Sequence, residues 1–217
     1  WIEHLTTDQE VGGSNPPRRT FSFPISPAAP IRARGAVDIR TGGRPVDDAT
    51  GVSWLRDEDS DLRSMLQALE EARAAADQGE VPVGAIIMHP EKGLVARARN
   101  AKETLQDPTA HAEILAIGQA AEALGSWGLE QCTLFSTLEP CPMCAGAILQ
   151  SRIERVVFGA SDSRWGAIDS KMNIFEPGLF NHDVVWQGGV LETEAAGLLK
   201  DFFREIRDGQ PRYRGKE

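Results

Sequence analysis

The chain has 217 residues, of which 41% are hydrophobic and 25% are charged, the proportions of a soluble globular protein. Its formal net charge of −9 argues against broad, sequence-independent binding of nucleic acid, which requires a basic surface. No apolar run approaches the roughly 20 residues of a membrane helix, the first residues lack the pattern of a secretory signal, and three cysteines do not suggest a disulfide framework, so we expect a cytoplasmic protein.

Residues 1–60 carry six prolines and no sustained helical or strand period. Such a segment buries too little apolar surface to offset its loss of conformational entropy, which predicts a disordered extension. A second hypothesis is that this segment is upstream sequence read as protein, because residues 1–20 can be back-translated, with permitted codons, into a transfer-RNA gene with the anticodon ACG. Translation would then begin between about Val52 and Met65, and an intact mass that includes Trp1 would contradict the idea.

Residues 61–217 have the pattern of one folded domain. Apolar side chains recur at helical spacing over 62–76, and Gly79 follows as a candidate C-cap. Short β-rich runs predict a strand at 83–88 and a hairpin partner at 94–100. The next elements are a helix from 109 or 110 to 121, a strand at 133–138, a helix at 143–149, strands at 155–159 and 184–187, and a helix at 194–207. Alternating strands and helices predict an α/β layer structure.

The strongest chemical signal is His111-Ala112-Glu113 followed by Pro140-Cys141-Pro142-Met143-Cys144. His111, Cys141 and Cys144 supply three zinc ligands and leave the fourth position to water, as in catalytic zinc sites. Both halves of the pattern fall where a predicted helix begins, and the unpaired N–H groups and dipole of a helix start favour thiolate and hydroxide. The pattern is the H-x-E…P-C-x-x-C signature of zinc-dependent nucleobase deaminases. We therefore expect one Zn²⁺ per subunit.

Zinc lowers the pKa of a bound water to about 7, so zinc-bound hydroxide is the expected nucleophile. Glu113 is expected to accept the water proton and to pass it to a ring nitrogen and then to the leaving amine. Taken alone, Cys-x-x-Cys also occurs in structural zinc sites and redox pairs, but the joint pattern favours the deaminase-type site. We expect Cys132 to be a buried thiol outside this site.

From about Met65 to Arg207 the chain resembles the bacterial tRNA-specific adenosine deaminases, which belong to the cytidine-deaminase-like superfamily. The matching stretches are residues 80–85, 107–113, 137–147, 155–160 and 201–204. The zinc motif is shared across the superfamily, whereas the first and last stretches are more particular to the tRNA enzymes. The resemblance implies an α/β, three-layer fold with a central five-stranded mixed sheet flanked by helices. It also implies a homodimer whose active sites lie near the subunit interface.

The same resemblance implies hydrolytic deamination of the wobble adenosine to inosine in the anticodon stem-loop of tRNA-Arg with anticodon ACG, the target base being flipped out. Asn100 matches the family asparagine that hydrogen-bonds the purine, although it could instead cap a strand end. The positions that resemble contacts to flanking anticodon nucleotides are Asp162, Asn181, Phe203 and Arg204. At least one of Phe202 and Phe203 is expected to be a core residue instead.

The loop at 163–170 departs from the family, because it carries a bulky Trp165 and lacks the lysine that many relatives have near Arg164. Two alternatives remain open. A deaminase of free guanine or cytosine would use the same metal and Glu113, although the basic C-terminal helix with Phe202-Phe203-Arg204 favours RNA. A zinc-stabilised RNA-binding module without activity would have no need of a proton shuttle at Glu113.

Overall fold

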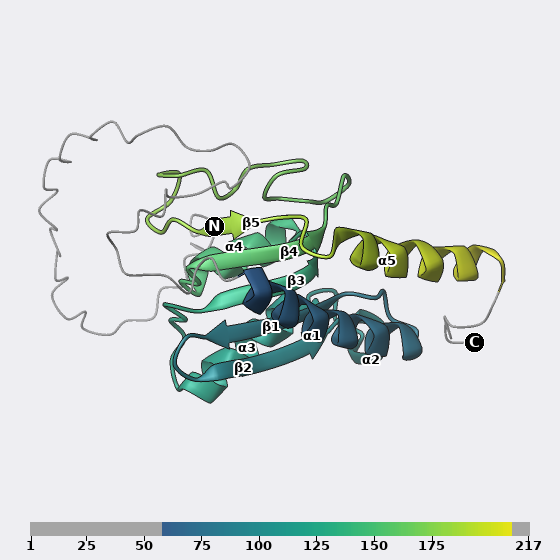
Figure 1. Ribbon diagram of the computed structural model, residues 1–217, viewed down its shortest axis with the longest axis horizontal. Coiled ribbons are helices and arrows are strands. Elements are labelled where there is room, and N and C mark those ends of the chain that lie inside the picture. The colour runs from purple at the N-terminus through teal and green to yellow at the C-terminus, as the bar shows by residue number, and fades with distance from the viewer. Residues whose placement is uncertain (1–57, 210–217) are drawn as a thin grey trace, which may run out of the picture. The chain divides into compact units, whose positions relative to one another are not determined.

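The computed structural model describes residues 58–209, which form a five-stranded sheet between two layers of helices (Figure 1). The strands are β1 (Gly84–His89), β2 (Gly93–Arg99), β3 (Thr133–Leu138), β4 (Arg155–Ala160) and β5 (Val185–Gln187). The helices are α1 (Glu58–Asp77), α2 (Lys102–Leu105), α3 (Ala112–Leu124), α4 (Pro142–Gln150) and α5 (Glu192–Arg207). The predicted three-layer α/β class is confirmed.

Element bounds differ from the predicted ones mainly at helix starts. Helix α1 begins at Glu58, so the last residues of the predicted extension are helical, and residues 1–57 lie outside the described part of the chain. Helix α2 was not predicted, since four residues are too few to show a period. Helix α3 begins at Ala112 rather than near 109, because Asp107 holds the preceding residues in a turn by accepting a hydrogen bond from the backbone of Thr109 (2.8 Å).

The order of the strands is β2-β1-β3-β4-β5. Strand β1 is antiparallel to both β2 and β3, whereas β3, β4 and β5 run parallel. The register pairs Gly84 with Arg99, and Leu138 with Ala160. Consequently the start of β1 and the ends of β2, β3 and β4 lie along one edge of the sheet. The segments that carry Asn100, Cys141 and Asp162 all leave the sheet from that edge.

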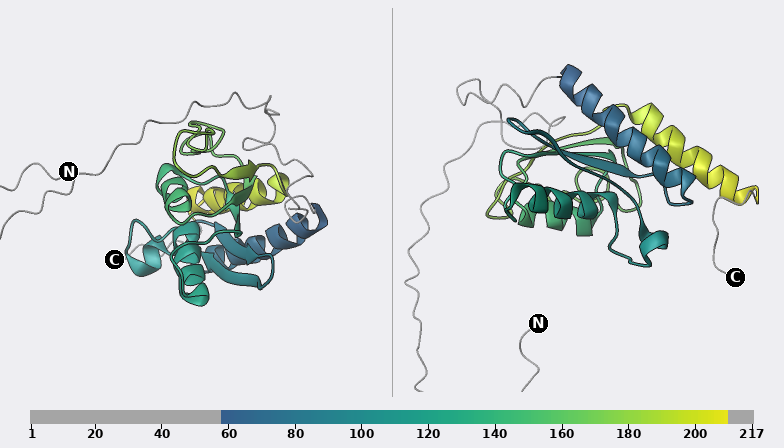
Figure 2. Two further views of the ribbon diagram at one scale, coloured as in Figure 1. Left: turned by 90° about the vertical axis from the view of Figure 1, so that its left-hand side faces the viewer. Right: turned by 90° about the horizontal axis from the view of Figure 1, so that it is seen from below.

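The two faces of the sheet are covered by different helices. Figure 2 shows α1 and α5 beside each other on one face, while α3 and α4 cover the other. Successive side chains of β1 pack against the two helix layers in turn. Ile86 packs against Met65 of α1, whereas Ile87 joins the core that contains Ala116 of α3 and Ile148 of α4. Neighbouring strand residues point to opposite faces, so a buried mixed sheet needs apolar residues at both positions, as β1 has.

Glycine permits the close approach of α1 to β1. A Cβ atom at Gly84 would overlap the carbonyl oxygen of Ala68, so a larger residue would push the helix away from the strand. The helix ends in a turn at Gly79, whose φ of 79° is left-handed, and the backbone of Glu80 donates to the carbonyl of Ala75 (3.0 Å). The predicted C-cap is therefore confirmed as the position that stops α1 ahead of β1. Between residues 58 and 209, no helix has both the length and the apolar character to cross a membrane.

A buried ion pair ties α1 to β4. Arg155 donates to both oxygens of Asp61 (2.7 and 2.6 Å) and to Gln187 (2.9 Å). In Asp61→Ala the Arg155 guanidinium stays buried without its counter-charge, so we expect the free energy of unfolding to fall by about 3–5 kcal/mol in urea denaturation. The matched control is Asp201→Ala, which breaks an exposed pair with Arg204 and should cost less than about 1 kcal/mol. Equal losses in the two variants would contradict the prediction.

Candidate active site

Two helix starts meet at the edge of the sheet described above. His111 is the N-cap of α3, and its carbonyl accepts from the backbone of Leu115 (3.0 Å). Cys141 is the N-cap of α4, and Pro142 occupies the first helical position, where its fixed φ and missing N–H cost nothing. Cys144 follows in the first turn of α4. Both halves of the motif lie at helix starts, as predicted. His111, which the predicted helix from 109 or 110 would place in its first turn, is instead the capping residue with extended backbone.

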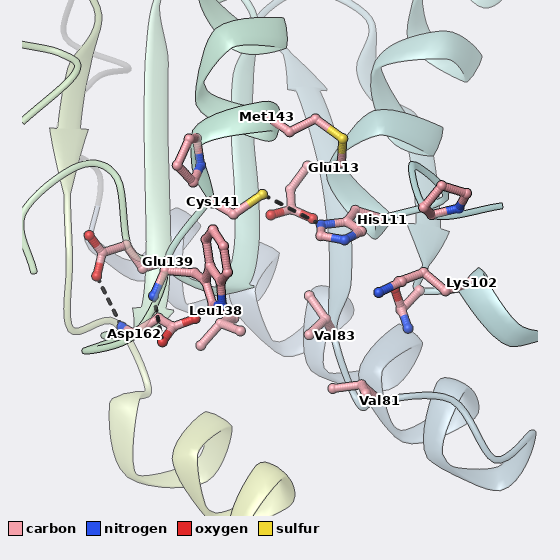
Figure 3. Close-up of a pocket in the computed structure, with 14 residues that line it drawn as sticks. Val81, Val83, Lys102, His111, Glu113, Leu138, Glu139, Cys141, Met143 and Asp162 are labelled. Carbon is pink, nitrogen blue, oxygen red and sulfur yellow. Dashed lines mark hydrogen bonds between the residues drawn. The ribbon is translucent and has the colours of Figure 1, made fainter. Parts of the chain in front are cut away.

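The ligand atoms of His111, Cys141 and Cys144 form a small triangle, and Figure 3 shows the His111 and Cys141 side chains facing each other. The sulfur atoms of the two cysteines are 3.6 Å apart, and Nδ1 of His111 lies 3.7 Å from the Cys141 sulfur and 3.5 Å from the Cys144 sulfur. In a tetrahedral zinc site the bond lengths imply about 3.8 Å between two sulfurs and about 3.6 Å between sulfur and nitrogen. The triangle therefore fits one tetrahedral metal ion with a fourth position open. Cys132 is fully buried outside this group, as expected.

The three ligands perturb each other's protonation. The pKa of Cys141 is lowered to about 4, because the Cys144 thiol donates to its sulfur and His111 adds a second hydrogen bond. The pKa of Cys144 is raised by that same hydrogen bond, by burial and by the charge of Glu113. The hydrogen bond with Cys141 also raises the pKa of His111. The shifts of the three pKa values thus arise mainly from hydrogen bonds and charges that these side chains share with one another and with Glu113.

Glu113 lies in the first turn of α3 and is only 3% exposed. Its carboxylate points toward His111 and Cys141 (Figure 3). Burial raises the pKa of Glu113, with opposing contributions from its own backbone N–H and from His111. A carboxylate with a raised pKa beside a candidate metal site is suited to accept a proton and to return it.

A cavity of about 620 Å³ opens above this group, within the range of small-molecule sites. Its wall includes Asn100, which is 5% exposed and donates from Nδ2 to the buried Glu80 (3.1 Å). Glu80 also accepts from the backbone of Thr104 (2.7 Å). The Asn100 side chain is thus held by Glu80 at the cavity wall and does not cap a strand. The rest of the lining includes the charged residue Lys102 and the apolar residues Val81, Val83, Pro108, Leu138 and Met143.

The loop after β4 forms another part of the wall through Asp162 and Trp165. Glu139, only 2% exposed, holds this loop by accepting hydrogen bonds from the backbone of Asp162 (3.0 Å) and from three consecutive N–H groups at 168–170 (3.1, 2.8 and 3.0 Å). The Ser170 hydroxyl donates as well. Burial raises the pKa of Glu139, but these donors outweigh it and lower the pKa overall. The sequence did not predict this function of Glu139, because its partners are backbone N–H groups far along the chain.

Three of the predicted RNA contacts are not part of the cavity wall. Asn181 accepts from Arg152 (3.1 Å) on the surface. Phe203 is 42% exposed and meets the buried Phe202 edge-on, with ring centroids 5.4 Å apart, so Phe202 is the core residue of the two. Arg204 is exposed and pairs with Asp201 (2.7 Å). Only Asp162 and Asn100, among the predicted substrate contacts, line the cavity.

Comparison with known proteins gives the family. The model of the MafB19-like deaminases matches residues 59–207. The tRNA-specific adenosine deaminase of Bacillus subtilis (strain 168) is 50% identical over 143 residues, which cover 66% of this chain and 88% of the relative. A solved structure from studies of A-to-I editing by tRNA:A34 deaminases is 42% identical and superposes with a TM-score of 0.60, covering 63% of this chain and 99% of the other.

A more distant likeness is to the guanine deaminase of Nitrosomonas europaea, with 28% identity and a TM-score of 0.56 over 65% of this chain and 83% of the other. Family, fold and the arrangement of the site thus agree with the resemblance in the sequence. The chain belongs to the deaminase family, and within it to the tRNA-specific adenosine deaminases.

Proposed function

We propose that this protein hydrolyses the wobble adenosine of tRNA-Arg with anticodon ACG to inosine, with release of ammonia. The observation that carries the proposal is the metal-ligand triangle of His111, Cys141 and Cys144 at one cavity, with the buried Glu113 beside it. The substrate is carried over from the relatives, whose names include tRNA-specific adenosine deaminase and tRNA:A34 deaminase. The cavity has room for one nucleoside rather than for a folded RNA, so the target base must enter it alone.

His111, Cys141 and Cys144 would hold one Zn²⁺, since their spacing fits the tetrahedral geometry that zinc prefers. A bound zinc ion supplies a water molecule with a pKa close to 7. Glu113 accepts one proton from the attacking water and delivers it to the purine ring nitrogen, which keeps it. Glu113 then transfers the second proton, from the hydroxyl group on carbon 6, to the departing amino group, which leaves as ammonia. Carbon 6 of the base thereby exchanges an amine for a carbonyl oxygen.

Asn100 orients the purine. The hydrogen bond from its amide N–H to Glu80 fixes the orientation of the carboxamide, and its oxygen would accept a hydrogen bond from the base. Asp162 and the exposed Lys102 lie on opposite sides of the cavity in Figure 3, with His111 and Val83 between them. A cation at the rim suits the phosphates next to a flipped nucleotide. Asn181, Phe203 and Arg204 lie on the surface outside the cavity, where they would contact the anticodon nucleotides on either side of the target.

The protonation of the ligands predicts how metal affinity depends on pH. Above about pH 4 Cys141 is already a thiolate, so metal binding displaces protons from Cys144 and, below the raised pKa of His111, from His111 as well. Between about pH 6 and about pH 5 both groups release a proton when zinc binds, so we expect the apparent Kd for zinc to rise about 100-fold as the pH falls by one unit. Above the pKa of His111 only Cys144 releases a proton, so the apparent Kd should rise about tenfold for each unit by which the pH falls. Competition with a chromophoric chelator measures this slope. A Kd that does not change with pH would contradict the predicted ligand protonation.

The proposal is tested by incubating the full, zinc-loaded chain with an anticodon stem-loop bearing ACG and measuring inosine at the wobble position. The matched control is the same stem-loop with guanosine at that position, which offers no exocyclic amine at carbon 6. Inosine from the first substrate alone supports the proposal. Zinc-containing, folded protein that forms no inosine overturns it.

The alternative function is deamination of a free base. The likeness to a guanine deaminase and a cavity that would also hold a free purine favour this candidate over other small molecules. Guanine and cytosine are therefore tested in parallel, with ammonia release as the measurement. Turnover of either base without turnover of the stem-loop would replace the proposed substrate.

We also propose that the chain forms a homodimer and acts in the cytoplasm. A homodimer with active sites near the subunit interface follows from the family resemblance, and sedimentation velocity of the purified chain tests it. A transfer-RNA substrate and a metal site built from two free thiols suit the reducing cytoplasm, where thiols persist.

A further inference from the structure

Trp165 is an aromatic residue of the cavity wall whose side chain remains exposed. It lines the cavity that holds the metal site, yet 66% of it is exposed to solvent. Indole rings have a large apolar surface and are usually mostly buried. An exposed indole at the mouth of a cavity therefore offers a flat apolar face to whatever crosses the rim.

The backbone of Trp165 is held in place on both sides. Asp162 accepts from the N–H groups of Arg164 (2.8 Å) and Trp165 (3.2 Å), and its carbonyl accepts from Gly166 (2.8 Å). Immediately after Trp165, a Cβ atom at Gly166 would overlap the Glu139 carboxylate, so the chain passes directly over that anchor. Residues 167 and 168 are fully buried in the core. The indole is thus presented by a fixed loop, which reduces the entropy lost when a ligand stacks on it.

We infer that Trp165 is a stacking platform for one of the two bases that flank the target nucleotide. The inference rests on the proposed function, because it requires an RNA substrate. When the target base enters the cavity, its covalently linked neighbours must stay outside and cross the rim, where Trp165 lies. Stacking on an aromatic side chain is the usual way in which proteins hold a splayed base. This assigns Trp165 to recognition of the anticodon loop rather than to the chemistry at carbon 6.

The test compares Trp165→Ala and Trp165→Phe with the wild-type chain on the ACG stem-loop and on two stem-loops that lack the base either 5′ or 3′ of the target. The matched control is Trp127→Ala, since Trp127 is 72% exposed and does not line the cavity. Single-turnover inosine formation over a range of protein concentrations separates binding from the chemical step. Metal content and circular dichroism establish that each variant is folded.

We expect Trp165→Ala to weaken stem-loop binding by about fivefold to about 100-fold with little change in the rate of the bound complex. Trp165→Phe should retain most of the binding, and Trp127→Ala should behave as the wild type. On one of the two stem-loops with a missing base, wild type and Trp165→Ala should bind equally, because the stacking partner is gone.

Two results would overturn the inference. If Trp165→Ala binds the intact stem-loop as tightly as the wild type, there is no stacking contribution. If the loss is the same on all three stem-loops, Trp165 acts through the structure of the loop and not through a flanking base. Absence of inosine with the wild-type chain would overturn the proposed function and this inference together, which separates that failure from the other two.

Discussion

Replacing Glu113 with glutamine is expected to lower the rate of inosine formation by about 10²–10⁴-fold or more, with one metal ion per chain retained. Glutamine has the shape of glutamate, but it cannot accept the proton of the attacking water or return it to the base. Glu113 is buried beside the ligands without belonging to the metal triangle, so its loss should leave the triangle intact. Single-turnover assays on the ACG stem-loop give the rate, and elemental analysis gives the metal content.

Glu122→Gln is the matched control, because Glu122 is an exposed residue of the same helix, α3. It removes the same charge without touching the cavity and should retain wild-type activity. A Glu113→Gln protein that still forms inosine at the wild-type rate would refute the proton-shuttle function of Glu113. If the rate falls but the metal is also lost, the variant reports on metal binding, and Glu113→Asp then separates the two effects.

Replacing Cys141 with serine is expected to lower zinc affinity by more than about 100-fold. Removal of a residue that only hydrogen-bonds a metal ligand already lowers metal affinity by about 10- to 100-fold, and Cys141 is proposed to bind the metal directly. The change removes the thiolate with the lowered pKa and leaves Cys144 and His111 as two ligands of three. Activity should disappear with the metal. Because a metal that binds only the native state stabilises it, added zinc should raise the melting temperature of the wild type but not that of the variant.

Cys132→Ala is the control for the loss of a cysteine. Cys132 is fully buried in the core, where burial raises the pKa of its thiol to about 11, and it is outside the ligand triangle. The variant is expected to lose some stability through the cavity that it creates. It should nevertheless bind one zinc ion and keep the response of its melting temperature to zinc. Loss of metal in Cys132→Ala would contradict the assignment of the ligands.

The grouping of His111, Cys141 and Cys144 could be predicted because their chemistry and their local structure are encoded together in short segments. Pro140 and Pro142 mark the start of α4 around Cys141, and the strand before them is a short run rich in residues that favour strands. Local signals of this kind predicted the bounds of all five strands between residues 58 and 209 to within one residue. Helix α2 lacked such a signal because four residues carry no period.

The carboxylates that shape the cavity could not be predicted in the same way. Glu139 binds N–H groups that are 23–31 residues further along the chain, and Glu80 binds Asn100 across 20 residues. Backbone N–H groups are the same for every residue type except proline, so no side-chain pattern announces such partners. Asn100 itself was identified only through the resemblance to a family, and its contact with Glu80 explains how it is oriented.

The anchoring of the 162–170 loop by Glu139 has a consequence for how this enzyme can diversify. Most of the anchor consists of backbone N–H groups, so the exposed side chains at 163–165 can be exchanged without loosening it. Glu139 is also two residues from Cys141, which keeps these exposed side chains in a constant position relative to the proposed metal site. If Trp165 stacks on a flanking base as we infer, substitutions at 163–165 will change the recognition of RNA without moving the proposed hydrolytic centre, and this loop is the place to begin retargeting the protein to other anticodons.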